Sequence, residues 1–97
     1  MRCEKHMSVI AVILKVEPQS LDDALYEACA HMQNTGHDTV LDFSYVQRLD
    51  PKNLEMMQKL ASIAEDKELN VGLRGVNVDI YKVLKLARLA ERFCFLN

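Results

Sequence analysis

The sequence has little of what marks flexible or membrane-spanning chains: its 97 residues include three glycines, two prolines and no tryptophan. So few glycines argue against a low-complexity chain, a long linker and a Gly-rich phosphate loop. The longest apolar run, from Val9 to Leu14, has six residues, whereas a membrane span needs about 20. No small-residue cleavage site follows it, as one would in a secretory signal. We therefore expect no membrane insertion.

An excess of basic residues is absent too. Twelve lysines and arginines stand against fourteen aspartates and glutamates, which gives a net charge of −2. Domains that bind nucleic acid usually carry a clear basic excess, so we expect no nucleic-acid partner. The cysteines, Cys3, Cys29 and Cys94, are odd in number and follow no spacing pattern, unlike the even sets of secreted disulfide frameworks. Their arrangement favours reduced thiols and a cytoplasmic location.

The chain does have a regular alternation of strand-like and helix-like segments. Its length fits one domain over residues 1–97, in which the N-terminal segment 1–7 is poorly defined and shows no periodicity. The order β-α-β-α-β-α-β predicts right-handed crossovers and an α/β fold, with helices packed on a small, mostly parallel sheet. The predicted strands are 9–16, 39–44, 69–73 and 93–96. The predicted helices are one capped by Ser20 and closed by Gly36, one from Pro51 to at least Ala64, and one at 78–90.

Candidate catalytic and metal-binding groups are few and scattered. Cys29 shares the apolar stripe of the first predicted helix, and Cys94 stands between two phenylalanines, so both are expected to pack as small hydrophobic residues. Cys3 and His6 alone supply too few ligands for a structural zinc site. No pair of carboxylates resembles an acid and a base with shifted pKa values. We therefore expect no catalytic residue, no metal, no cofactor and no enzyme activity.

The most informative segment joins the second predicted strand to the second predicted helix, from Val40 to Asp50. Asp50 is placed to cap a helix whose first residue is Pro51, a position at which the missing N–H costs little. A helix N-terminus at the carboxyl end of a parallel strand presents unpaired N–H groups, and ligands of open α/β sheets tend to bind at this edge. The segment fits either a binding edge or an ordinary strand-to-helix connection.

This segment resembles the core of STAS domains, the fold of bacterial anti-sigma factor antagonists. The family pattern runs hydrophobic-Leu-Asp-hydrophobic-Ser, then a hydrophobic residue, then Asp-Ser-Ser-Gly-Leu at a helix start. Further matches follow in the third strand, the third helix and the closing strand, so that the likeness spans about residues 8–96. The matching residues are Leu41, Asp42, Phe43, Ser44, Val46, Leu49, Asp50 and Leu54, followed by Val71, Leu73, Gly75, Val83, Leu84, Leu89 and Phe93.

The resemblance implies a non-catalytic, protein-binding module. In the family, the unphosphorylated domain binds an anti-sigma factor kinase and frees a sigma factor, and phosphorylation of the helix-start serine releases the domain by adding negative charge. This partner switching regulates transcription. Lys52 stands at the phosphoserine position, so the resemblance implies that the serine switch is absent and that no phosphorylation site is carried over. The expected partner-binding surface is Arg48, Asp50, Lys52, Asn53, Glu55 and Met56.

Other functions remain open on the sequence. STAS-type soluble subunits of bacterial lipid ABC transporters grip an ATPase and need no phosphoserine, so an accessory subunit of this kind is the first alternative. A small thiol- or nucleotide-dependent enzyme is the second, although nothing in the sequence indicates an activated cysteine. The family also has an additional first strand, which only the charged residues 2–6 are available to supply. A thinly covered sheet edge would suit a protein partner or a homodimer.

Overall fold

Residues 11–15 and 20–96 are described by the structure, a computed structural model of the chain. The expected β-α-β-α-β-α-β order is confirmed. Val9, Ile10 and Val16 of the expected first strand, and the segment 1–7, lie outside the described residues. The elements are β1 (Ala11–Lys15), α1 (Leu21–Thr35), β2 (Asp38–Asp42), α2 (Pro51–Asp66), β3 (Val71–Arg74), α3 (Val78–Leu86), the 3₁₀ turn η2 (Ala90–Arg92) and β4 (Cys94–Leu96).

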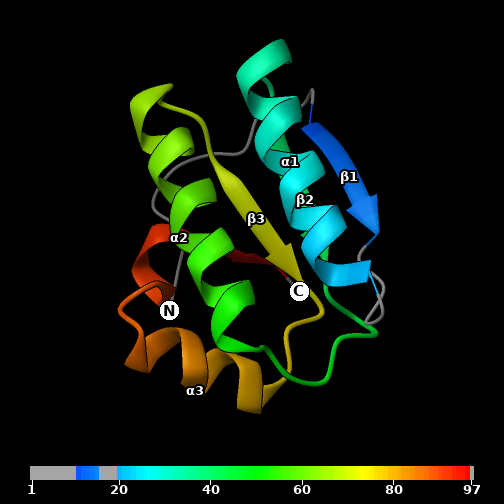
Figure 1. Cartoon of the computed structure of the whole chain (residues 1–97), viewed down its shortest axis with the longest axis vertical. Coiled ribbons are helices and arrows are strands. Elements are labelled where there is room, and N and C mark those ends of the chain that lie inside the picture. The colour runs from blue at the N-terminus through cyan, green and yellow to red at the C-terminus, as the bar shows by residue number, and fades with distance from the viewer. Residues whose placement is uncertain (1–10, 16–19, 97) are drawn as a thin grey trace.

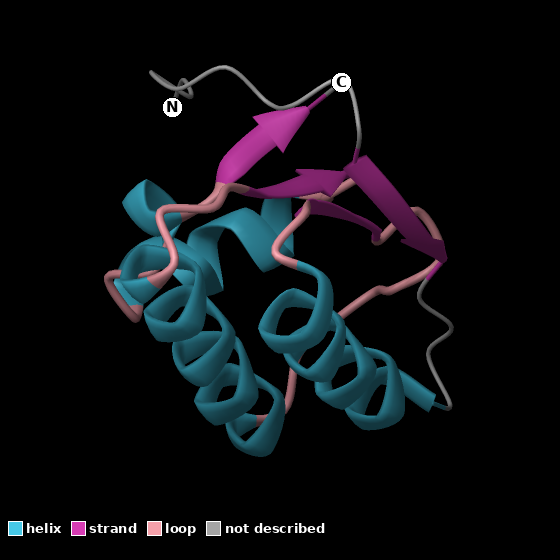
Figure 2. Cartoon of the chain, turned by 90° about the horizontal axis from the view of Figure 1, so that it is seen from above, coloured by secondary structure: helices cyan, strands magenta, loops and turns pink. Residues whose placement is uncertain are grey.

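The described strands form a parallel sheet in the order β1-β2-β3-β4. Each strand pairs with the next one along the chain, and the register aligns Leu14, Leu41, Leu73 and Phe95 in one row. Right-handed crossovers between such strands place each connecting helix on the same side of the sheet. Figure 2 shows the helices gathered on one face of the strands. Figure 1 shows α1 and α2 side by side in front of the sheet, with α3 below them in that view.

The hydrophobic core lies between this face of the sheet and the helices. Leu41 and Leu73 belong to the aligned row and are fully buried, as is Phe43 just after β2. Burial of one such side chain contributes about 1.5–3 kcal/mol to the free energy of unfolding. The helices supply apolar stripes that meet these residues, with Leu25, Met32, Met57, Leu60, Ile80 and Leu84 all fully buried.

Helix α3 is shorter than the sequence predicts: it ends at Leu86 and not at residue 90. Arg88 adopts a left-handed conformation with φ 61°. The Arg88 N–H donates to the Lys85 carbonyl at 3.1 Å, and the Leu89 N–H donates to the Leu84 carbonyl at 2.8 Å, which is the pattern of a Schellman helix end. Glycine is the residue that normally signals this ending, and arginine stands there instead. Among the described residues, no helix is long and apolar enough to cross a membrane.

The two ends of α1 differ in how well the sequence predicts them. Gly36 closes the helix with φ 69°, and its N–H donates to the Met32 carbonyl at 3.2 Å, as expected. Ser20 precedes the helix, but its side chain makes no capping hydrogen bond, so the expected cap is wrong. The N-terminus of α1 is engaged through Asp22, whose partners come from α2.

Candidate protein-binding surface

The N-terminus of α2 is built by residues that follow one another in the sequence. Asp50 is the N-cap, with extended backbone angles (φ −84°, ψ 160°), and Pro51 takes the first helical position. The side-chain oxygen of Asn53 accepts a hydrogen bond from the Asp50 backbone N–H at 2.8 Å. This bond ties the first turn of α2 to the loop before it, and the predicted helix start is confirmed.

Asp22 of α1 connects this helix start to the neighbouring helix. Its Oδ1 accepts a hydrogen bond from the Asn53 side-chain amide, and its Oδ2 lies 3.7 Å from the Lys52 Nζ. We call Asp22, Lys52 and Asn53 the α1–α2 clasp. Asn53 is 5% exposed, whereas the Lys52 side chain is 76% exposed. Because an exposed ion pair contributes only about 0–1 kcal/mol, Lys52 is held weakly and is accessible to a partner.

The predicted contact residues lie on the loop before α2 and on its first two turns. Asn53 differs from the others because it is buried and its side chain is engaged within the fold. We therefore assign Asn53 a supporting role beneath the surface. The accessible members are Arg48, Asp50, Lys52 and Glu55, which are exposed, and Met56, which is half-buried.

A second polar cluster lies where β2 and β3 end. Asp42 accepts hydrogen bonds from the Ser44 backbone N–H, at 3.0 Å, and from the Ser44 hydroxyl. An Arg74 Nη lies 3.7 Å from its other oxygen. The Ser44 hydrogen bonds, followed by the charge of Arg74, lower the pKa of Asp42 below its ordinary value. A carboxylate held ionised in this way anchors the loop and is a weak general base. The strand β2 ends at Asp42 and not at Ser44 as predicted, because Ser44 bonds back to the Asp42 side chain in the turn that follows.

We expect Ser44→Ala to lower the free energy of unfolding by about 0.5–1.5 kcal/mol near pH 7. The bonded carboxylate has a lowered pKa in the folded state, so its contribution is present above the ordinary Asp pKa of about 3.9. That contribution is lost as the pH falls through the folded-state pKa. The difference between the two proteins should therefore shrink in acid. Urea denaturation near pH 7 and near pH 3 measures it.

Ser20→Ala serves as the control for this measurement, because the Ser20 side chain makes no capping hydrogen bond. Its effect should be small and the same at both pH values. If the loss caused by Ser44→Ala were undiminished in acid, Ser44 would act through its packing and not through the Asp42 carboxylate.

The groups considered for thiol or metal chemistry do not assemble. Cys29 is a free, buried thiol, and burial raises its pKa, which keeps it protonated and weakly nucleophilic. Cys94 is disulfide-bonded, so the expectation of reduced thiols is wrong for this residue. The cysteine pattern therefore no longer supports a cytoplasmic location. The described part of the chain holds no cluster of three or more His, Cys, Asp or Glu that could bind a metal ion. Cys3 and His6 lie outside it.

Comparisons with known proteins support the fold. No protein-family model matches the sequence, and no curated protein matches it. A similar solved structure is the crystal structure of a protein from Thermotoga maritima that is described as a candidate anti-sigma factor antagonist. The match has a TM-score of 0.74 at 18% sequence identity and covers 95% of this chain and 83% of the other. The chain therefore has the STAS-like fold that its sequence predicts.

Proposed function

We propose that this chain is a non-catalytic STAS-type domain that binds another protein in the manner of a bacterial anti-sigma factor antagonist. The observation that carries the proposal is the accessible start of α2, where Lys52, 76% exposed, stands at the family's phosphoserine position. Residues 1–97 act in this proposal as one domain. Its partner is an anti-sigma factor kinase, and binding regulates transcription by partner switching.

The first turn of α2 is suited to binding without a phosphoserine switch. It reads Pro51-Lys52-Asn53 and carries no hydroxyl group. A cation in the first turn opposes the helix dipole at a cost of about 0.3–1 kcal/mol, and Lys52 adds nothing to the core because it is exposed. Its ion pair with partly exposed Asp22 contributes only about 0–1 kcal/mol, so the charge of Lys52 is available to a partner. Because this turn has no serine to phosphorylate, the family's switch cannot release the domain from its partner.

We expect Lys52→Glu to weaken partner binding about tenfold or more, which corresponds to at least about 1.4 kcal/mol. The substitution reverses a charge on the proposed surface, and like charges placed across an interface oppose binding. The fold should tolerate it: the new carboxylate faces Asp22, but at this exposed site their repulsion costs only about 0–1 kcal/mol, and a carboxylate near a helix N-terminus is favourable. Tagged chains of residues 1–97 are used to capture partners from the native lysate for mass spectrometry, and the affinity of the purified pair is then measured by calorimetry.

Lys67→Glu is the matched control, because Lys67 is an exposed lysine at the other end of the same helix. Recovery of an ATP-binding anti-sigma factor kinase that is lost with Lys52→Glu and kept with Lys67→Glu would support the proposal. Recovery of a transporter ATPase with its permease would favour the accessory-subunit alternative. Equal recovery with both variants would show that the α2 surface is not the contact.

A further inference from the structure

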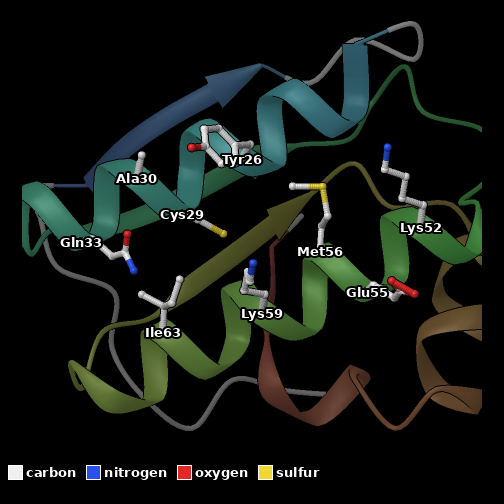
Figure 3. Close-up of a pocket in the computed structure, with 9 residues that line it drawn as sticks. All are labelled: Tyr26, Cys29, Ala30, Gln33, Lys52, Glu55, Met56, Lys59 and Ile63. Carbon is white, nitrogen blue, oxygen red and sulfur yellow. The ribbon is translucent and has the colours of Figure 1, made fainter.

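A groove of about 490 Å³ runs between α1 and α2 (Figure 3). Three members of the proposed surface line it, namely Lys52, Glu55 and Met56. The groove continues along α2 from the clasp to Ile63, in the fourth turn of the helix. The surface around Lys52 is thus the open end of a longer depression between two helices.

The α2 side of the groove is a single stripe with alternating chemistry. Lys52, Met56, Lys59 and Ile63 are spaced at i, i+4, i+7 and i+11, so they follow one face of the helix. Figure 3 shows Lys52, Met56 and Lys59 rising from α2 on the side of α1. The lysines are seven residues apart, which places their backbones about 10 Å apart along the helix axis. An apolar side chain follows each lysine along the stripe.

The α1 side of the groove is lined by a row of uncharged residues. Tyr26, Cys29, Ala30 and Gln33 are spaced at i, i+3, i+4 and i+7, as on a helix face that meets another helix. Tyr26 is 70% exposed, and an exposed aromatic ring at the edge of a groove is typical of a contact residue in protein interfaces. These residues of α1 and those of α2 therefore face one depression from opposite sides.

The charge of the lining residues determines which partner segment fits between α1 and α2. The residues that line the groove include two lysines and one glutamate, Glu55, although the whole chain carries a net charge of −2. Lys59 of α2 and Cys29 of α1 both line the groove. Burial raises the pKa of the Cys29 thiol, and the positive charge of Lys59 partly opposes this rise. Among the described residues Lys59 has no ion pair, whereas Lys52 is weakly paired with Asp22. An acidic segment can therefore meet Lys59 directly and compete with Asp22 for Lys52, which a basic segment cannot do.

We propose that the groove receives an amphipathic helix of the partner, with an apolar stripe that packs on Tyr26 and Met56 and two carboxylates two turns apart that meet Lys52 and Lys59. This helix-in-groove mode is one of the recurring ways in which proteins recognise helical segments. The inference rests on the proposed function and deepens it by stating the chemistry of the partner.

The test uses two synthetic peptides of about 18 residues, long enough to form a marginally stable helix. Both carry the same leucine stripe, one with glutamates at i and i+7 and the other with lysines there. The ¹⁵N-labelled chain of residues 1–97 is titrated with each peptide and followed by NMR. We expect amide shifts confined to α1 and α2, and about tenfold tighter binding of the glutamate peptide. Lys59→Glu should reverse this order, whereas Lys82→Glu, an equal charge change on exposed α3, should not.

A second pair of variants tests the shape of the groove. Ala30 lines it, so Ala30→Trp should fill it and weaken binding about tenfold. Glu27→Trp adds the same ring to an exposed position of α1 outside the groove and should leave binding unchanged.

The inference is overturned if both peptides bind equally, or if amides outside α1 and α2 shift. It is also overturned if the chain alone self-associates through the groove. An absence of shifts at about 1 mM peptide, where a complex of millimolar Kd is half formed, has the same meaning.

The lysate experiment separates this inference from the proposed function. A captured partner that Lys52→Glu loses but Ala30→Trp and Lys59→Glu keep would leave the proposed function standing and refute the groove as the docking site. If all three variants kept the partner, the α2 surface itself would be refuted as the contact.

Discussion

Gly75→Ala is expected to lower the free energy of unfolding by about 3 kcal/mol, and therefore to lower the Tm by roughly 12–24 °C in a chain of this size. Gly75 follows β3 with φ +72°, a conformation that costs any other residue free energy. A Cβ at this position would collide with the Ser44 Oγ and would lie 2.9 Å from both the Cα and the backbone N of Ser44. Because two of these atoms are backbone, rotation of a side chain cannot relieve the contact.

Gly36→Ala is the matched control for this prediction. Gly36 has nearly the same φ, +69°, but no atom lies within 4 Å of a Cβ built there. It should therefore incur only the conformational cost, about 1 kcal/mol. Chemical denaturation of the two variants beside the parent protein gives both numbers, and their difference measures the contact with Ser44. Equal losses would mean that the loops after β2 and β3 move apart without cost.

The close approach of Gly75 to Ser44 explains why the residue after β3 is a glycine. In the sequence, Gly75 marks only the turn after a strand, and Ser44 only the end of another. The register of β2 and β3 pairs Asp42 with Arg74, so the two loops leave the sheet side by side. The Phe43 N–H also donates to the Arg74 carbonyl at 2.7 Å. Only glycine leaves room for these two turns to stack.

Much of the fold is predictable because its signals are local. Apolar β-branched runs, amphipathic spacing and the Asp50-Pro51 helix start each depend on a few neighbouring residues, and the structure confirms the order of elements and the parallel sheet. The end of α3 is not predictable in this way. Ala87, Leu89 and Ala90 continue an apolar pattern, while the chain turns at Arg88 in a left-handed conformation that the sequence does not signal with glycine.

The candidate site is predictable only where it is continuous in the sequence. Residues 48–56 lie together because they are neighbours along the chain, so the loop and the first turns of α2 emerge from the sequence alone. The contact between Asp22 and Asn53 joins residues 31 positions apart and depends on how α1 packs against α2. The groove depends on the same packing. Asn53 therefore looks like a surface residue in the sequence and is a buried one in the structure.

Asn53→Asp is expected to lower the free energy of unfolding by about 2–4 kcal/mol near neutral pH. The substitution keeps the shape of the side chain and the oxygen that accepts the Asp50 N–H, but it replaces the amide that donates to Asp22 with a second carboxylate. At a position only 5% exposed, two facing carboxylates cannot both be ionised without a large cost. Repulsion between Asp22 and the new carboxylate would then push the starts of α1 and α2 apart.

The pH dependence of this variant identifies the cause. The repulsion raises the pKa of the new carboxyl in the folded state, so the loss of stability should be complete above that raised pKa, fade as the pH falls towards the ordinary Asp pKa of about 3.9, and be absent below it. Once protonated, that carboxyl donates a hydrogen bond to Asp22 as the amide did. Asn34→Asp, at an exposed position near the end of α1, should cost only about 0.5 kcal/mol. Urea denaturation of both variants near pH 7 and near pH 3 measures these losses. If Asn53→Asp lost as much stability near pH 3 as near pH 7, repulsion from Asp22 would not be the cause of the loss, and the hydrogen bond between Asn53 and Asp22 would not be what joins α1 to the start of α2.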